Sequence, residues 1–356
     1  MIKIPMQMAA GIGSLPHREV APALRLVAES LPLMPHWPQL PLRHEGEGFI
    51  EQYIQPLVEL GLMVKRPGKL PFFDTSQPDW TEKITRFYEL YLAAEEGDRA
   101  ALNFFALRPE GAAGFYGFLA NLQEKGTGAA RYLKGQVSGL LTVGLQLTDQ
   151  NRQPAYYQGD LKDILLKTLA LAARWQVETL KAFGLPVALF IDDPRIYACG
   201  LSTHITLNKN EITKELNTLF RAIHRSGAAA GVHACAGADW SIVLDSEADI
   251  LSFDAYGYFS TLVGFEQEIN NFFCRGGVLA WGIVPTAVKV LTDDRHSLLA
   301  LWQEQMEQLV SRGVDRKNLY SRWLVTPSCG TGLLPLEMAE EIYRLTGELA
   351  EDMGRG

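Results

Sequence analysis

One histidine and two cysteines are the side chains of this sequence that could bind a metal ion together. His233 and Cys235 are two positions apart, directly after a short apolar run. Residues i and i+2 of a strand point to the same side, so the imidazole and the thiol aim at one point. Cys329 follows a second apolar run, 323–325, far along the chain. We expect the three side chains to meet at the mouth of a barrel and to bind a zinc ion.

This ligand set favours catalysis over a structural role. Zinc bound by one histidine and two cysteines, with an exchangeable fourth position, is typical of catalytic sites. Structural zinc sites usually carry close Cys-x-x-Cys pairs, and the sequence contains none. Two thiolates make the ion electron-rich, which suits activation of a substrate thiol better than generation of hydroxide. The chemistry that needs such a thiolate is alkyl transfer, most simply methylation at sulfur.

Composition excludes several other classes of protein. The 356 residues are 47% hydrophobic and 21% charged, which is ordinary for a soluble globular protein. The net charge of −8, without a basic stripe, argues against a nucleic-acid partner. No apolar run approaches the roughly 20 residues that span a membrane, and the N-terminus shows no signal-peptide pattern. We therefore expect a cytoplasmic protein, in which Cys199 and Cys274 are ordinary buried thiols.

Short apolar strands alternate with amphipathic helices along most of the chain, a pattern that predicts a parallel sheet buried on both faces. Seven strands are predicted to begin near residues 8, 132, 187, 229, 250, 277 and 323. An eighth is expected near Leu62-Met63-Val64 or near Phe104. The economical arrangement is a (β/α)8 TIM barrel that forms a single domain over residues 1–356, with a doubly wound open sheet as the competitor.

Polar residues at the ends of many strands favour the barrel, because strand ends surround one site in a barrel and spread along a crevice in an open sheet. These residues are Ser14, Gln136, Asp192, His233, Asp254, Thr286 and Cys329. The segment 32–80 differs from the rest, since it holds eight prolines and little periodicity. We interpret it as a Pro-rich excursion over the barrel and not as a separate domain.

The motifs resemble those of a known enzyme family. His-x-Cys at 233–235 and Pro-x-Cys-Gly at 327–330 resemble the catalytic barrel of cobalamin-independent methionine synthases. They are also similar to zinc methyltransferases of the uroporphyrinogen decarboxylase-like superfamily that methylate coenzyme M. Three further stretches, 12–14, 134–142 and 192–194, resemble the synthase motifs Ile-Gly-Ser, Lys-Gly-x-x-Thr-Gly-Pro and Asp-Glu-Pro in the same order along the chain.

The resemblance implies a function and a set of site residues. It implies a zinc-dependent methyltransferase acting on a small thiol, with homocysteine the leading acceptor and either methyltetrahydrofolate or a methyl-corrinoid protein as donor. Gly13 and Ser14 would cradle the acceptor amino acid, and Asp192 would bind its amine. Gln136 is expected to line the same pocket. The plain alternatives are an ordinary turn at 13–14 and a turn-capping role for Asp192.

Two features depart from the family. The full synthase has two barrels, and this chain has room for one. The family's fourth zinc ligand is a Glu, whereas the corresponding strand here ends in Asp254. Three roles are open for Asp254, namely binding zinc, orienting His233 and holding a substrate amine. Trp240 either stacks on a flat ligand or packs the start of a helix.

Three other functions are alternatives to a zinc-dependent methionine synthase-like enzyme. One is a metal-free decarboxylase of the same superfamily, which binds acidic tetrapyrroles and needs neither Cys235 nor Cys329. The second is a corrinoid-linked thiol methyltransferase of the coenzyme M type. The third is a non-catalytic subunit that binds a corrinoid partner or a thiol. Alone, His233 would be read as an ordinary core histidine. The two cysteines in register with it favour the metal site.

Overall fold

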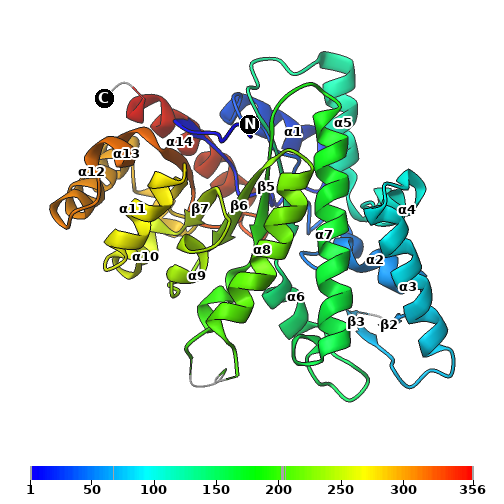
Figure 1. Ribbon diagram of the computed structural model, residues 1–356. Coiled ribbons are helices and arrows are strands. Elements are labelled where there is room, and N and C mark those ends of the chain that lie inside the picture. Colours follow the sequence, from blue (N-terminus) through cyan, green and yellow to red (C-terminus); the bar gives the residue numbers. More distant parts are fainter. Residues whose placement is uncertain (1, 67, 202–203, 205, 355–356) are drawn as a thin grey trace.

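Seven parallel strands form one curled sheet at the centre of the molecule (Figure 1). The computed structural model describes residues 2–66, 68–201, 204 and 206–354. The strand order is β1-β9-β8-β7-β6-β5-β4, and every neighbouring pair is parallel. The seven predicted strands are therefore confirmed. They are β1 (Met8–Ala9), β4 (Leu133–Ser138), β5 (Val187–Asp192), β6 (Ala229–Ala234), β7 (Ile250–Phe253), β8 (Val278–Val284) and β9 (Trp323–Pro327).

Helices cover the outer face of the sheet (Figure 1). Residues 255–262 and 266–274 form two separate helices, and Gly264 between them adopts a φ of +113°. Within the described residues, none of the helices combines the length and the apolar character needed to cross a bilayer. The α-helices are α1 (Val20–Ser30), α2 (Glu51–Glu59), α3 (Trp80–Glu95), α4 (Arg99–Phe104), α5 (Ala113–Lys125), α6 (Leu140–Gln146), α7 (Gly159–Lys181), α8 (Lys209–Arg225), α9 (Ser241–Leu244), α10 (Ala255–Leu262), α11 (Glu266–Cys274), α12 (Arg295–Ser311), α13 (Arg316–Ser321) and α14 (Leu336–Met353).

The two faces of the sheet pack into two separate apolar clusters. In β5, Val187, Leu189 and Ile191 belong to the large cluster shared with the helices, whereas Ala188 and Phe190 belong to the second cluster. The second cluster contains only strand residues and nearby loop residues, so it fills the concave side of the curl. Its members are Met8, Ala10, Met34, Ala188, Phe190, Ala229, Ile250, Val278, Ala280 and Leu324.

Neither candidate for the eighth strand joins this sheet, so that prediction is wrong. Residues Met63–Arg66 form β2, which pairs antiparallel with β3 (Lys69–Phe73) in a separate two-stranded sheet. Phe104 is the last residue of helix α4. Three of the four residues of β2 are exposed, which is incompatible with a strand buried on both faces. Among the described residues, no eighth hydrogen-bonded strand closes the sheet.

Residues 33–39, the start of the predicted excursion, lie between the two edges of the sheet. On the β4 side, Lys134 N donates to Pro35 O at 3.0 Å. On the β1 side, Gln39 N donates to Gly13 O, and Leu15 N donates to Gln39 O, both at 2.9 Å. The prolines at 35 and 38 lack N–H groups, which explains why isolated bridges form in place of a continuous ladder.

Helix α5 packs directly on this segment, and one glycine makes the contact feasible. A Cβ atom added to Gly114 would lie 1.9 Å from Pro38 O. We expect Gly114→Ala to lower the free energy of unfolding by about 1–3 kcal/mol, because the helix must move away from the segment. Urea unfolding measures the change. The matched control is Gly159→Ala in the first turn of α7, where nothing lies within 4 Å of the added atom. Equal stability of the two variants would contradict the packing.

Candidate metal centre

Strand register places the central polar residues side by side. Asp192 on β5 is the Cα partner of His233 on β6, and His233 is the partner of Ser252 on β7. All three side chains share the parity of the concave cluster, because Phe190, Ala229 and Ile250 belong to it. The three residues lie at or near the carboxyl ends of their strands. The concave face therefore carries an acid, an imidazole and a hydroxyl in one row.

The three predicted ligands converge at this end of the sheet. Cys235 follows β6 directly, and Cys329 comes two residues after β9. One ligand atom from each of His233, Cys235 and Cys329 lies within 4.8 Å of the other two. A tetrahedral zinc ion with bonds of about 2.0–2.3 Å separates its ligands by roughly 3.5–4 Å. Only a small adjustment would bring these atoms to that spacing, so the group could bind a metal ion.

A hydrogen bond orients the imidazole toward the cysteines. His233 Nδ1 lies 3.0 Å from Ser252 Oγ, while the buried Nε2 has no hydrogen-bond partner. Donation from Nδ1–H to the hydroxyl leaves the Nε2 lone pair free, which is the tautomer that binds a metal. Ser252 was not predicted to have this function. Its position near the end of the predicted strand that follows the strand of His233 was the signal available in the sequence.

The two thiols influence one another. A hydrogen bond between them lowers the pKa of Cys235 and raises that of Cys329. Cys235 therefore ionises before Cys329. His233 partly offsets the shift of Cys329. Both thiols are partly buried, so solvent reaches the centre from the side of the cysteines.

The two adjacent acids after β5 have different surroundings. Asp193 accepts hydrogen bonds from Leu141 N at 3.0 Å and Thr142 N at 2.9 Å, so it caps the start of α6. Asp192 is 4% exposed, and its Oδ1 has no partner. Burial raises the pKa of Asp192 to about 6, against the opposing charges of Lys134 and His233. The capping role considered for Asp192 falls to Asp193, and Asp192 keeps one oxygen free for a ligand.

The predicted turn at 13–14 lies against the loop of Cys329. Ser14 Oγ accepts a hydrogen bond from Gly332 N at 3.2 Å, and Ser14 O accepts one from Thr331 Oγ1 at 2.8 Å. Gly13 packs on Gln136, because an added Cβ would lie 2.8 Å from the Gln136 Cδ. Gln136 is fully buried and donates to Trp37 O at 3.1 Å, so part of its amide is already used within the protein.

Two other predicted site residues have structural contacts. Asp254 Oδ1 accepts from Gly257 N at 2.6 Å and caps α10, and the group of three ligands does not include it. Trp240 is fully buried, lies edge-on to Phe253 and donates to Thr261 Oγ1 at 2.9 Å. Trp240 thus has the packing role of the two predicted, because no face of its ring is open to a flat ligand.

A buried hydroxyl that the sequence did not single out faces the same side. Thr326 on β9 is 1% exposed, and its Oγ1 has no partner. It shares the parity of Leu324, which lies in the concave cluster. Buried polar atoms nearly always find a partner, so an unpaired group at a strand end indicates a ligand or a water. Together with Asp192 Oδ1 and His233 Nε2, it marks this end of the concave face as the candidate site.

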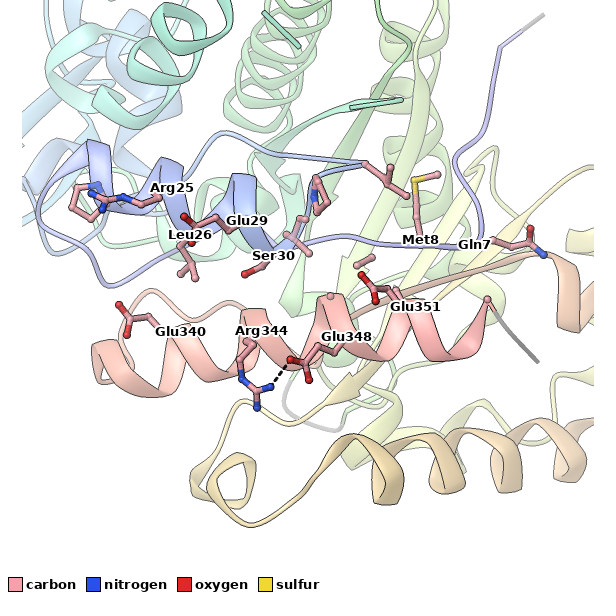
Figure 2. A pocket seen from close by; sticks show the side chains of 18 of the residues that line it. Gln7, Met8, Arg25, Leu26, Glu29, Ser30, Glu340, Arg344, Glu348 and Glu351 are labelled. Carbon is pink, nitrogen blue, oxygen red and sulfur yellow. Dashed lines mark hydrogen bonds and ion pairs between the residues drawn. The ribbon is translucent and has the colours of Figure 1, made fainter. Parts of the chain in front are cut away.

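A cavity of about 1000 Å³ lies elsewhere, between α1 and α14. Figure 2 shows Arg25 and Glu29 of α1 opposite Glu340, Arg344 and Glu348 of α14. None of the three predicted ligands lines this groove. We therefore locate the candidate site by its metal-binding donor atoms and not by this cavity.

Comparison with known proteins gives no further guide to the site. No protein-family model matches the sequence, and a search of curated proteins finds no significant match.

The contact between the thiols predicts the order in which they react. In metal-free protein titrated with iodoacetamide, we expect Cys235 to be alkylated at lower pH than Cys329, because Cys235 ionises first. Mass spectrometry of the tryptic peptides measures each rate, with the exposed Cys274 as internal reference. Faster alkylation of Cys329 than of Cys235 would refute this order of ionisation.

The raised pKa of Asp192 predicts a pH dependence of stability. The folded chain holds this proton more tightly than the unfolded chain does, so the contribution is present below pH 4 and is lost as the pH rises through 6. Between pH 4 and 7, metal-free wild type should lose on the order of 3 kcal/mol more unfolding free energy than Asp192→Asn. Urea unfolding at several pH values tests this, with the exposed Asp160→Asn as control. Parallel profiles for wild type and Asp192→Asn would count against it.

Proposed function

We propose that this chain is a zinc-dependent methyltransferase that transfers a methyl group to the thiol of a small acceptor. Homocysteine is the leading acceptor, and the donor is methyltetrahydrofolate or a methyl-corrinoid. The observation that carries the proposal is the approach of His233, Cys235 and Cys329 to within 4.8 Å at the carboxyl end of the sheet. An alkyl transfer to sulfur is the reaction that this donor set suits best.

The donor atoms fit zinc. One imidazole nitrogen and two sulfurs are ligands that zinc prefers, and the unpartnered His233 Nε2 is directed to the thiols without competing for another group. Three protein ligands leave one of four positions for the substrate. When bound, zinc lowers the pKa of a thiol that joins it, so that the acceptor sulfur is a thiolate near neutral pH.

The chain's own residues would bind and orient the acceptor. Asp192 Oδ1 lies beside His233 in register and has no partner, so it can accept hydrogen bonds from an ammonium group. Ionised Asp192 also carries the negative charge that attracts this ammonium group. The turn at Gly13 and Ser14 contacts the loop of Cys329, which puts it next to the ligand group and able to meet the acceptor's carboxylate. These groups would hold an amino-acid thiol at both ends.

The transfer itself is a displacement at carbon. The acceptor thiol loses its proton to solvent, and its sulfur forms a bond to the methyl carbon while the bond between methyl and donor breaks. The donor keeps the electron pair of that bond. Holding the two reactants in line supplies much of the rate, because a bimolecular reaction becomes effectively unimolecular.

We further propose that the sheet belongs to a (β/α)8 barrel. The segment 33–39 would take the place of the eighth strand, since it contacts β4 on one side and residues 13–15 on the other. A barrel of this kind keeps its active site at the carboxyl ends of the strands, where the three ligands lie.

Metal content tests the ligand set. Purified protein should contain about one zinc per chain by elemental analysis, and Cys235→Ser and Cys329→Ser should each lose most of it. Cys274→Ser is the matched control, because this thiol is exposed and outside the group. Zinc-loaded protein should form methionine from homocysteine with one of the two donors, and the two Ser variants should not. Zinc that survives both substitutions, or decarboxylation of an acidic tetrapyrrole without metal, would overturn the proposal.

A further inference from the structure

Lys134 is buried in the concave face without a carboxylate partner. It is 1% exposed, and within the described part of the chain it forms no ion pair. Lysine is almost never fully buried unless its charge is paired. Burial lowers its pKa to about 8, and the charge of Asp192 opposes this shift. A methionine would fill a similar volume without the free-energy cost of burying a charge, so we expect the ammonium group to have a specific function.

The short contact of that ammonium group is with the predicted substrate turn. Lys134 Nζ donates to Ile12 O at 2.6 Å, and Gln136 Oε1 lies 3.4 Å away. The ring centroid of Phe190 lies 4.8 Å from Lys134 Nζ, so a cation–π interaction also stabilises the charge. Gly13, the next residue of the turn, packs on Gln136. The turn is therefore held on β4 by a charge-assisted hydrogen bond and by a close contact.

The turn at residues 12–14 also forms hydrogen bonds with the loop that carries Cys329. Ser14 O accepts from Thr331 N at 3.2 Å and from Thr331 Oγ1 at 2.8 Å, and Ser14 Oγ accepts from Gly332 N. A Cβ atom on Gly330 would lie 2.4 Å from Ser14 Oγ, so the loop touches the turn from the residue after Cys329 onward. A chain of direct contacts thus runs from Lys134 through residues 12–14 to the cysteine.

We propose that Lys134 is a positioning residue, which holds the 12–14 turn and through it fixes the loop of Cys329. Its effect on metal binding rests on the proposed function, whereas its effect on the loop does not. The charge is buried at this point because a hydrogen bond from an ammonium group holds a carbonyl more tightly than a neutral donor can. Lys134 would therefore set the position of one metal ligand and of the acceptor turn together.

Hydrogen exchange in metal-free protein tests the link directly. In Lys134→Met, the amides of Thr331 and Gly332 should exchange about tenfold faster than in wild type, because the turn that accepts their hydrogen bonds is released. Amides of β7 should not change, which separates a local effect from general loss of stability. The control is Lys181→Met, since Lys181 Nζ also donates to a backbone carbonyl, that of Ser226, far from the site in sequence and sheet.

A second variant keeps the test decisive. Lys134→Gln replaces the charge with an amide too short to reach Ile12 O, and it serves if Lys134→Met does not fold. Unchanged exchange at Thr331 and Gly332 in a folded variant overturns the inference, whatever the protein does with metal. Faster exchange confined to these amides supports it even if methyl transfer is never found.

A double-mutant cycle then connects the loop to the metal. Zinc affinity should fall roughly tenfold or more in Lys134→Met and in Ser14→Ala, a magnitude typical of groups that orient metal ligands. The double variant should bind no more weakly than the weaker single variant, because both changes release one loop. Additive losses would show that Lys134 does not act through Ser14. Absence of zinc binding by wild type would instead count against the proposed function.

Discussion

The curl of the parallel sheet is the constraint on which the candidate metal centre depends. His233 and Cys235 come from β6 and Cys329 follows β9, and two strands separate β6 from β9. In a flat sheet, three strand spacings of about 4.8 Å would hold these side chains roughly 14 Å apart. The ligand atoms lie within 4.8 Å instead. The curvature of the sheet therefore decides whether the three side chains can share one metal ion.

The concave face shows how binding capacity opposes stability. Asp192, His233 and Thr326 each bury a polar atom without a partner, and Lys134 buries a charge without a carboxylate beside it. An unsatisfied buried group costs about 1–3 kcal/mol. Apolar side chains at these positions would make a more stable sheet. Such local conflicts are expected where a ligand completes the hydrogen bonds, and the unpartnered atoms of Asp192, His233 and Thr326 lie toward the carboxyl ends of strands on one face.

The seven strands and the three converging ligands could be predicted from the sequence. The strands follow from the local pattern of apolar residues, and the ligands follow from the rule that the carboxyl ends of parallel strands surround one site. The expected eighth strand was wrong at both candidate positions, and the isolated bridges of residues 36 and 39 were not predicted because prolines interrupt the pattern of this segment. The roles of Asp192 and Asp193 were not separated, since the cap on α6 comes from a loop that local pattern does not place. The burial of Trp240 and the capping by Asp254 likewise depend on helices packed from elsewhere in the chain.

The pairing of β1 with β9 joins the first strand of the described chain to the last. The contacts of Ser14 with Thr331 and Gly332 cross the same interval of sequence. At about 5–20 residues per second, a ribosome needs roughly 15–60 s to travel from one partner to the other. During that time the growing polypeptide contains at most two of the three candidate ligands, His233 and Cys235, because Cys329 has not yet been added. Metal binding by all three residues together would therefore require the synthesis of Cys329 and the pairing of β1 with β9.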